Sequence, residues 1–321
     1  MRPIKEIEKN KPITAPELFC ITVNTLLGSG IYFLPSFMAQ NVGRDGWLLW
    51  LMVLPAALLI AFLLCLASRS AFRSEGIACK IAEGVYTLVA LFLCAFSLAM
   101  MSALVGRLLL PSTPTPVIML LLSVPLWYAL PYGVRAMARL NTVMSLCFLL
   151  LFLCFALSAA NFEPANLRPV FTPSQWSSFP RAALLALAGL SGLLAIPVYC
   201  SATEKKQKTA VLSATALSVA GHSVISLLCV GVLGVQTVAA SDLPALLTIQ
   251  YGSFALFPKL FFTALFFNLL LIKPTLNCGY SGFFCLERIL KPARPRVLCT
   301  FYVLAVFLSA CGILTWLKPF A

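Results

Sequence analysis

Nine apolar runs, each long enough to cross a lipid bilayer, constrain this chain more than any other feature of its sequence. They lie near residues 17–39, 46–67, 85–110, 114–131, 139–160, 181–201, 209–235, 257–285 and 297–317. A transmembrane helix needs about 20 mostly apolar residues. Charged residues make up only 10% of the chain, whereas about 25% is typical of a soluble domain. The sequence therefore predicts a single all-α polytopic membrane domain over residues 1–321.

The basic residues are distributed as in a multi-pass membrane protein. The formal net charge is +13, yet sixteen of the 23 lysines and arginines fall in the N-terminal tail and in alternate connections. Cytoplasmic loops carry such an excess. The distribution predicts a multi-pass membrane protein with its N-terminus in the cytoplasm. We expect the membrane to be the bacterial cytoplasmic (inner) membrane. Because the basic residues form no continuous stripe or arm, we expect the partner surface to be the lipid bilayer and not nucleic acid.

The first and sixth apolar runs contain the same helix-breaking pattern. SGIYFLP at residues 29–35 and SGLLAIP at residues 191–197 share one spacing and lie 162 residues apart. Five spans separate them, so they cross the membrane in opposite directions. Interrupted segments in corresponding positions of two inverted halves indicate the substrate site of a secondary transporter. The alternative is that the small residues only allow close helix packing.

A broken helix exposes backbone groups that suit a zwitterion. Free N–H groups at the start of a half-helix carry partial positive charge and attract a carboxylate. Free C=O groups at the end of the other half-helix attract an ammonium group. An amino acid carries both charges, so the paired breaks favour an amino acid as the substrate.

The residues around the first break resemble the amino acid–polyamine–organocation (APC) superfamily. Its hallmark is G-[SAT]-G-[IV]-F-x-x-P, and residues 28–35 match it with Tyr32 in place of phenylalanine. Within that superfamily the chain looks most like YjeH-type exporters of methionine and branched-chain amino acids. The resemblance implies a LeuT-type inverted-repeat fold. Residues 17–160 would form the first five-helix repeat and residues 181–317 an incomplete second repeat, with the tenth and later helices missing.

The resemblance also implies positions for the substrate site. The substrate-binding residues carried over by position, together with the second glycine of the break in the sixth run, are Gly28, Ser29, Gly30, Ile31, Gly189, Leu190, Ser191 and Gly192. Ser191 is neutral where the family often has an acidic residue, which favours a small neutral amino acid. The stretch SATEKKQK at residues 201–208 is similar to the family's E-x-K-N-P turn and implies a gating role for Glu204.

Two ionisable side chains lie inside predicted spans: Lys273 in the eighth and His222 in the seventh. Such residues are costly in a membrane and are functional candidates by default. A buried lysine readily loses its proton, so we hypothesise that Lys273, with His222, couples transport to a proton. The alternatives are structural. Lys273 could bind carbonyl groups freed by Pro274, and His222 could bond a neighbouring helix.

These observations predict a secondary active transporter of small neutral amino acids, working by proton coupling or by exchange. A membrane enzyme is disfavoured because the chain has one histidine, no H-E-x-x-H and no G-x-S-x-G motif, whereas catalysis needs acid, base or nucleophile groups together. We expect no catalytic residue, cofactor or metal. The short second half leaves an alternative open: a truncated, non-transporting remnant or accessory subunit of a permease. A homodimer, in which a second copy completes the fold, is a further possibility.

Overall fold

The computed structural model describes residues 12–28, 30–71, 76–170, 177–203, 206–251 and 259–317. Over these ranges the chain forms helices joined by turns. The α-helices are α2 (Ala15–Leu26), α3 (Gly30–Val42), α4 (Gly46–Ala71), α5 (Ile77–Leu108), α6 (Thr115–Ala129), α7 (Val134–Ser158), α8 (Phe179–Gly189), α9 (Ile196–Ser201), α10 (Gln207–Leu233), α11 (Val235–Ala240), α12 (Pro244–Tyr251), α13 (Lys259–Leu290) and α14 (Pro295–Leu317). The 3-10 segments are η1 (Gly43–Asp45), η2 (Leu130–Tyr132), η3 (Ala159–Asn161), η4 (Pro164–Leu167) and η6 (Ser191–Ala195).

Each predicted apolar run corresponds to helical structure. The first run forms α2 and α3, the sixth forms α8, η6 and α9, and the other runs form α4, α5, α6, α7, α10, α13 and α14. In the described part of the chain, six stretches are long and apolar enough to cross a membrane, and one of these joins α3 to α4. The short helices α11 and α12, between the seventh and eighth runs, were not expected from the sequence.

The first run is broken where its glycines lie. α2 begins with a capping box, in which Thr14 Oγ1 accepts from the Glu17 amide and the Glu17 carboxylate accepts from the Thr14 amide;. It ends at Leu26, and α3 begins at Gly30. Pro35 lies inside α3, one turn beyond the break. The predicted interruption is confirmed, although the proline does not mark it.

The sixth run is broken by a change of helix type and not by extended chain. α8 ends at Gly189, and Leu190 followed by the five-residue 3-10 segment η6 separates it from α9. Pro197 occupies the first turn of α9, where a proline costs little because its missing N–H would have no helical partner. Both predicted interruptions therefore occur, with different local geometry.

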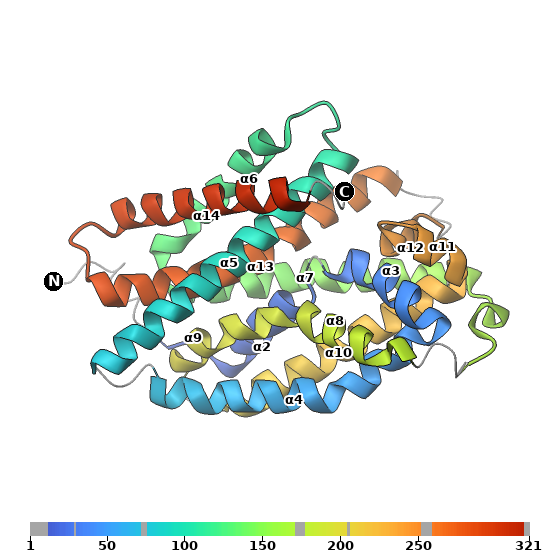
Figure 1. Ribbon diagram of the computed structural model, residues 1–321, viewed down its shortest axis with the longest axis horizontal. Coiled ribbons are helices and arrows are strands. Elements are labelled where there is room, and N and C mark those ends of the chain that lie inside the picture. Colours follow the sequence, from blue (N-terminus) through green and yellow to red (C-terminus); the bar gives the residue numbers. More distant parts are fainter. Residues whose placement is uncertain are drawn as a thin grey trace.

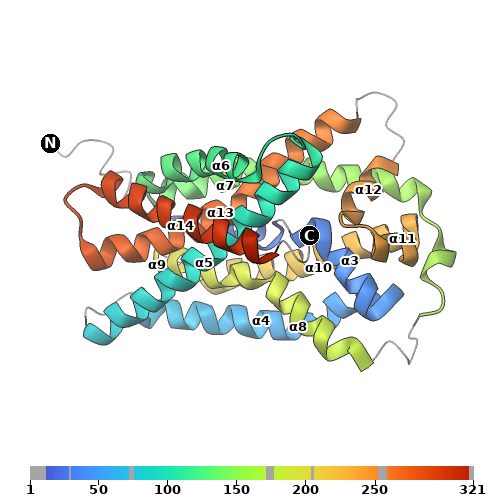
Figure 2. The same cartoon turned by 45° about the horizontal axis from the view of Figure 1, so that its top comes forward.

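The first half of the first broken helix, α2, lies inside the bundle. α2 packs against α7, α10 and α13, while α4 lies along α10 and α5 along α13. In Figures 1 and 2 the end of α4, the start of α5 and the turn from α13 to α14 lie at one end of the bundle, on the left. α11 and α12 lie at the opposite end. The described ends of these connections thus lie where the predicted alternation of the spans places them.

Candidate functional site

The two breaks lie side by side. A Cβ atom placed on Gly192 in η6 would lie 2.8 Å from Thr25 Cγ2 and 3.0 Å from the Thr25 carbonyl oxygen at the end of α2. A Cβ atom on Gly189, the last residue of α8, would lie 2.7 Å from Leu34 Cδ1 in α3. Both halves of the first broken helix therefore contact the break in the sixth. The glycines permit this approach because they have no side chain.

The first break also lies against α13. A Cβ atom on Gly28 would lie 2.1 Å from Pro274 Cγ. Leu27 closes α2 by donating its amide to Val23 O at 2.8 Å, and Ile31 donates to Gly28 O at 3.3 Å. Ser29, predicted to bind substrate, lies outside the described residues. Gly28 thus lies just after the end of α2, and Gly30 and Ile31 form the start of α3.

Leu190 and Ser191 continue the second break. The Leu190 amide donates to Leu187 O at 3.0 Å, and Leu193 donates to Leu190 O at 2.9 Å. Leu190 is buried, whereas Ser191 is partly buried. Glu204, predicted to act in gating, lies outside the described residues.

Lys273 bridges three helices in the interior. Its Nζ donates to Asn24 Oδ1 of α2 at 2.9 Å and to the Met144 carbonyl of α7 at 3.0 Å, and the side chain is 1% exposed. These acceptors belong to neighbouring helices and not to α13 itself. The ammonium group therefore lies beside the half-helix α2 and is hydrogen-bonded to it through Asn24.

A network of amide side chains, which no sequence pattern predicts, continues from this lysine. Asn24 Nδ2 donates to the Asn141 carbonyl at 2.7 Å. Asn141 and Asn277 pair through their side-chain amides at 2.8 and 3.0 Å. Asn277 Nδ2 also donates to Thr25 Oγ1 at 2.7 Å, and the Tyr199 hydroxyl donates to the Asn277 carbonyl at 3.0 Å. The network joins α2 and α9, one half of each broken helix, to α7 and α13.

His222 caps the end of α2. Its Nε2 lies 3.2 Å from the Leu26 carbonyl, one of the oxygens that the break leaves without a helical donor;. The imidazole ring stacks on Trp50 of α4, with ring centroids 4.4 Å apart and planes 13° apart. His222 and Lys273 therefore contact α2 at positions two residues apart, one through Leu26 and the other through Asn24.

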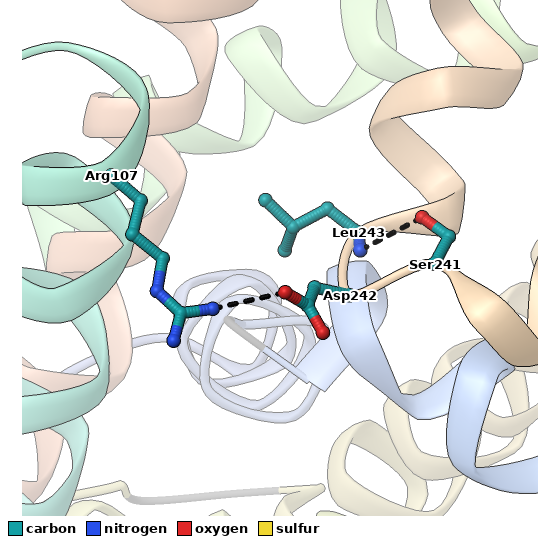
Figure 3. A network of polar contacts seen from close by, with 4 residues as sticks. All are labelled: Arg107, Ser241, Asp242 and Leu243. Carbon is teal, nitrogen blue, oxygen red and sulfur yellow. Dashed lines mark hydrogen bonds and ion pairs between the residues drawn. The ribbon is translucent and has the colours of Figure 1, made fainter. Parts of the chain in front are cut away.

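The end of the bundle that carries α11 and α12 is held by polar contacts (Figure 3). Arg107 Nη1 of α5 lies 3.0 Å from Asp242 Oδ2, between α11 and α12. Ser241 Oγ accepts from the Leu243 amide at 3.2 Å in the same turn. On the other side, Gln40 Nε2 of α3 donates to the Ala239 carbonyl at 2.8 Å. The pair of short helices is thus attached to both α5 and α3.

The opposite end is closed by different contacts. Arg288 Nη2 of α13 lies 3.1 Å from Glu83 Oε1 of α5. One turn along α5, the Tyr86 hydroxyl donates to the Leu194 carbonyl of η6 at 2.6 Å. The Ile13 amide, just before α2, donates to the Ala202 carbonyl just after α9 at 3.0 Å. At this end of the bundle, a main-chain hydrogen bond therefore joins the segment just before α2 to the residue after α9.

Comparison with solved structures shows the architecture. MHP1, a nucleobase-cation-symport-1 family transporter in a closed conformation with bromovinylhydantoin bound, matches with a TM-score of 0.63 and 15% identity, over 96% of this chain and 72% of that chain. At this identity the likeness concerns the fold, which is the LeuT-type fold that the sequence predicted. The comparisons do not support the narrower likeness to YjeH-type exporters.

Comparison with protein families gives a second result. A search of curated proteins found no match. A family model described as spore germination protein matches residues 12–315, which is nearly the whole chain. Fold and family are those of membrane permeases and not of enzymes. The chain belongs to the spore germination protein family.

Proposed function

We propose that the chain is a secondary transporter of small neutral amino acids in the bacterial cytoplasmic membrane, with its substrate bound between the two broken helices. One observation carries this proposal: the breaks in α2–α3 and α8–α9 lie against each other through Gly192 and Thr25. An intact helix bonds its own main-chain N–H and C=O groups. A helix that is broken inside a membrane leaves some of these groups free, and there only a bound solute or a neighbouring side chain can satisfy them.

The ends of the half-helices suit the two charges of an amino acid. The first turn of α3, which begins at Gly30, offers amide groups to the carboxylate. Ile31 lies in this turn, and its amide would exchange its bond to Gly28 O for the carboxylate. The carbonyl ends of α2 and α8, with Gly189, Leu190 and Ser191 of the second break, suit the ammonium group. Leu34, Leu190 and Leu193 are buried around the breaks, so an uncharged, apolar side chain fits this region best. Gly28, Ser29 and Gly192 complete the proposed site.

Lys273 is the proposed coupling residue. When protonated, it donates to Asn24 and Met144 and adds a positive charge beside α2. Loss of the proton removes that charge and weakens the hold on α2, because a hydrogen bond from a charged donor is about twice as strong as a neutral one. His222 at the end of α2 is the second candidate, and Glu204 is the proposed gating residue.

A second function is favoured by the family itself. A spore germination protein could bind a small amino acid as the signal for germination without carrying it across the membrane. It differs from the remnant or accessory-subunit alternative of the sequence analysis, which assigned the chain no ligand. The same site would serve both functions, so binding and flux must be measured separately.

The test is reconstitution in liposomes with radiolabelled alanine and leucine, with and without a proton gradient. We expect uptake by the wild type to increase with the gradient. Uptake by Lys273→Ala should no longer respond to the gradient, and Lys273→Arg, whose charge is permanent, should show a flat pH profile. Leu63→Ala on the exposed face of α4 is the control. An unchanged pH profile in both Lys273 variants contradicts the coupling role. Binding without uptake in the wild type favours the germination function over transport.

A further inference from the structure

The side chain of Leu34 occupies the space between the two breaks. Its Cδ1 lies 2.8 Å from the position of a Cβ atom on Gly30 and 2.7 Å from that of a Cβ atom on Gly189. Leu34 lies one turn after Gly30, and long side chains on a helix point back toward its N-terminus. The isobutyl group therefore folds over the start of α3 and reaches the end of α8. It is 4% exposed.

The two glycines are matched to this leucine. Contacts of this length between a real Cβ atom and another carbon would force one group to move, because protein interiors have little free volume. A residue larger than glycine at position 30 or 189 would therefore displace Leu34. These glycines have a second role beside interrupting the helices: they leave room for one apolar side chain between them.

The backbone of α3 is held by contacts to its neighbours. Ser36 Oγ and Gln40 Nε2 both donate to the Ala239 carbonyl of α11, at 3.3 and 2.8 Å. The connection after α11 is itself held to α5 by Arg107 and Asp242 (Figure 3). These contacts attach α3 to α11 and, through the turn after α11, to α5.

We propose that Leu34 determines which substrate side chains the site accepts. This inference rests on the proposed function. An amino acid whose carboxylate lies at the start of α3 places its own side chain next to Leu34, so that the leucine and the substrate share one apolar volume. A short substrate side chain leaves Leu34 in place, whereas a longer one must displace it. The site then prefers small neutral amino acids because of Leu34.

The test is competition binding to the purified full chain, with radiolabelled alanine displaced by glycine, alanine, valine, leucine or phenylalanine. For a hydrophobic pocket, one methylene changes discrimination by about 10- to 200-fold. We expect Leu34→Ala to raise the affinity for leucine relative to alanine by at least about 10-fold. Leu34→Phe should exclude valine and leucine. Leu63→Ala, a leucine that is 53% exposed on α4, should leave the order of affinities unchanged.

A double variant tests the contact itself. Gly189→Ala should weaken binding of all five amino acids, and Leu34→Ala in the same chain should restore it, because the new methyl group then fills the volume that Leu34 leaves. If Leu34→Ala does not fold, Leu34→Val provides the same comparison with a smaller change.

The outcomes separate the two proposals. If the wild type binds none of the five amino acids, the proposed function is wrong. If it binds them and the Leu34 variants keep the wild-type order of affinities, the role of Leu34 is wrong while the proposed function stands.

Discussion

Gly28 is the residue at which the packing around the first break is tightest. A Cβ atom there would lie 2.1 Å from Pro274 Cγ, and the proline ring cannot rotate away because it is closed onto its own backbone. We expect Gly28→Ala to destabilise the protein by about 1–3 kcal/mol, the usual cost of overpacking. Thermal unfolding in detergent checks this.

The matched control for that variant is Gly84→Ala. Gly84 lies inside α5 with nothing within 4 Å of its Cβ position. Alanine favours a helix over glycine by up to about 1 kcal/mol, so this variant should unfold at the same temperature as the wild type or slightly higher. Equal melting temperatures for the two variants would contradict the close contact between Gly28 and Pro274.

Single residues differ in how far the sequence reveals them. Glycines in an apolar run indicate either a break or close helix packing, and the matched pair of motifs favours the break. Lys273 is conspicuous because it is charged. Asn24, Asn141 and Asn277 are visible as polar residues in apolar runs, but their pairing is not. Asn141 and Asn277 are 136 residues apart, and no local pattern indicates which runs will pack together. Leu34 is hidden for another reason, because a leucine in an apolar run is typical of any membrane helix.

The helix α5 carries one ion pair near each end, and the two pairs should differ in strength. Asp242 and Arg107 have side chains that are 82% and 46% exposed, whereas Glu83 and Arg288 are 6% and 31% exposed. An exposed pair contributes about 0–1 kcal/mol. Removing one partner of a buried pair costs about 3–5 kcal/mol, because the other charge loses its compensation. We expect Asp242→Ala to have little effect on unfolding. Because Arg288 is partly exposed, we expect Arg288→Ala to lower stability by less than the loss of a fully buried pair, about 1–3 kcal/mol.

Chemical denaturation of the two variants in the same detergent measures this difference. High salt provides a second measure, since it screens exposed charges more than buried ones. Equal losses of stability for Asp242→Ala and Arg288→Ala would show that the difference in burial between the two ion pairs does not determine how much each contributes to stability.

The sequence predicts which helices exist better than it predicts their geometry. The nine runs and both interruptions follow from apolar length and from glycine and proline. The form of the second interruption does not, because a 3-10 turn and an extended chain have the same sequence signals. α11 and α12 were missed because each is too short to produce a hydrophobic period. They follow Gly234, whose φ of +76° ends α10;.

At the scale of the whole molecule, hydropathy predicts the spans, and charge predicts on which side of the membrane each connection lies. The fold comparison shows the LeuT-type arrangement. The division into repeats at residues 17–160 and 181–317 stays a prediction, as does a homodimer. Neither follows from composition, because both depend on contacts between surfaces that the apolar pattern does not specify. Orientation in the membrane is different, since it depends on charge alone and can be tested directly.

The predicted orientation places the turn between α13 and α14 in the cytoplasm and α11 outside. Ala293 in that turn and Thr237 in α11 are both exposed, and the described cysteines are buried or partly buried. In intact cells, a membrane-impermeant maleimide should therefore label Thr237→Cys and leave Ala293→Cys unlabelled until the cells are opened. The unsubstituted chain gives the background. The reason is the excess of lysine and arginine in the connections at the Ala293 end, which holds that end on the cytoplasmic side. Labelling of Ala293→Cys in intact cells, with Thr237→Cys protected, would show that the chain has the opposite orientation, with the turn between α13 and α14 outside and α11 in the cytoplasm.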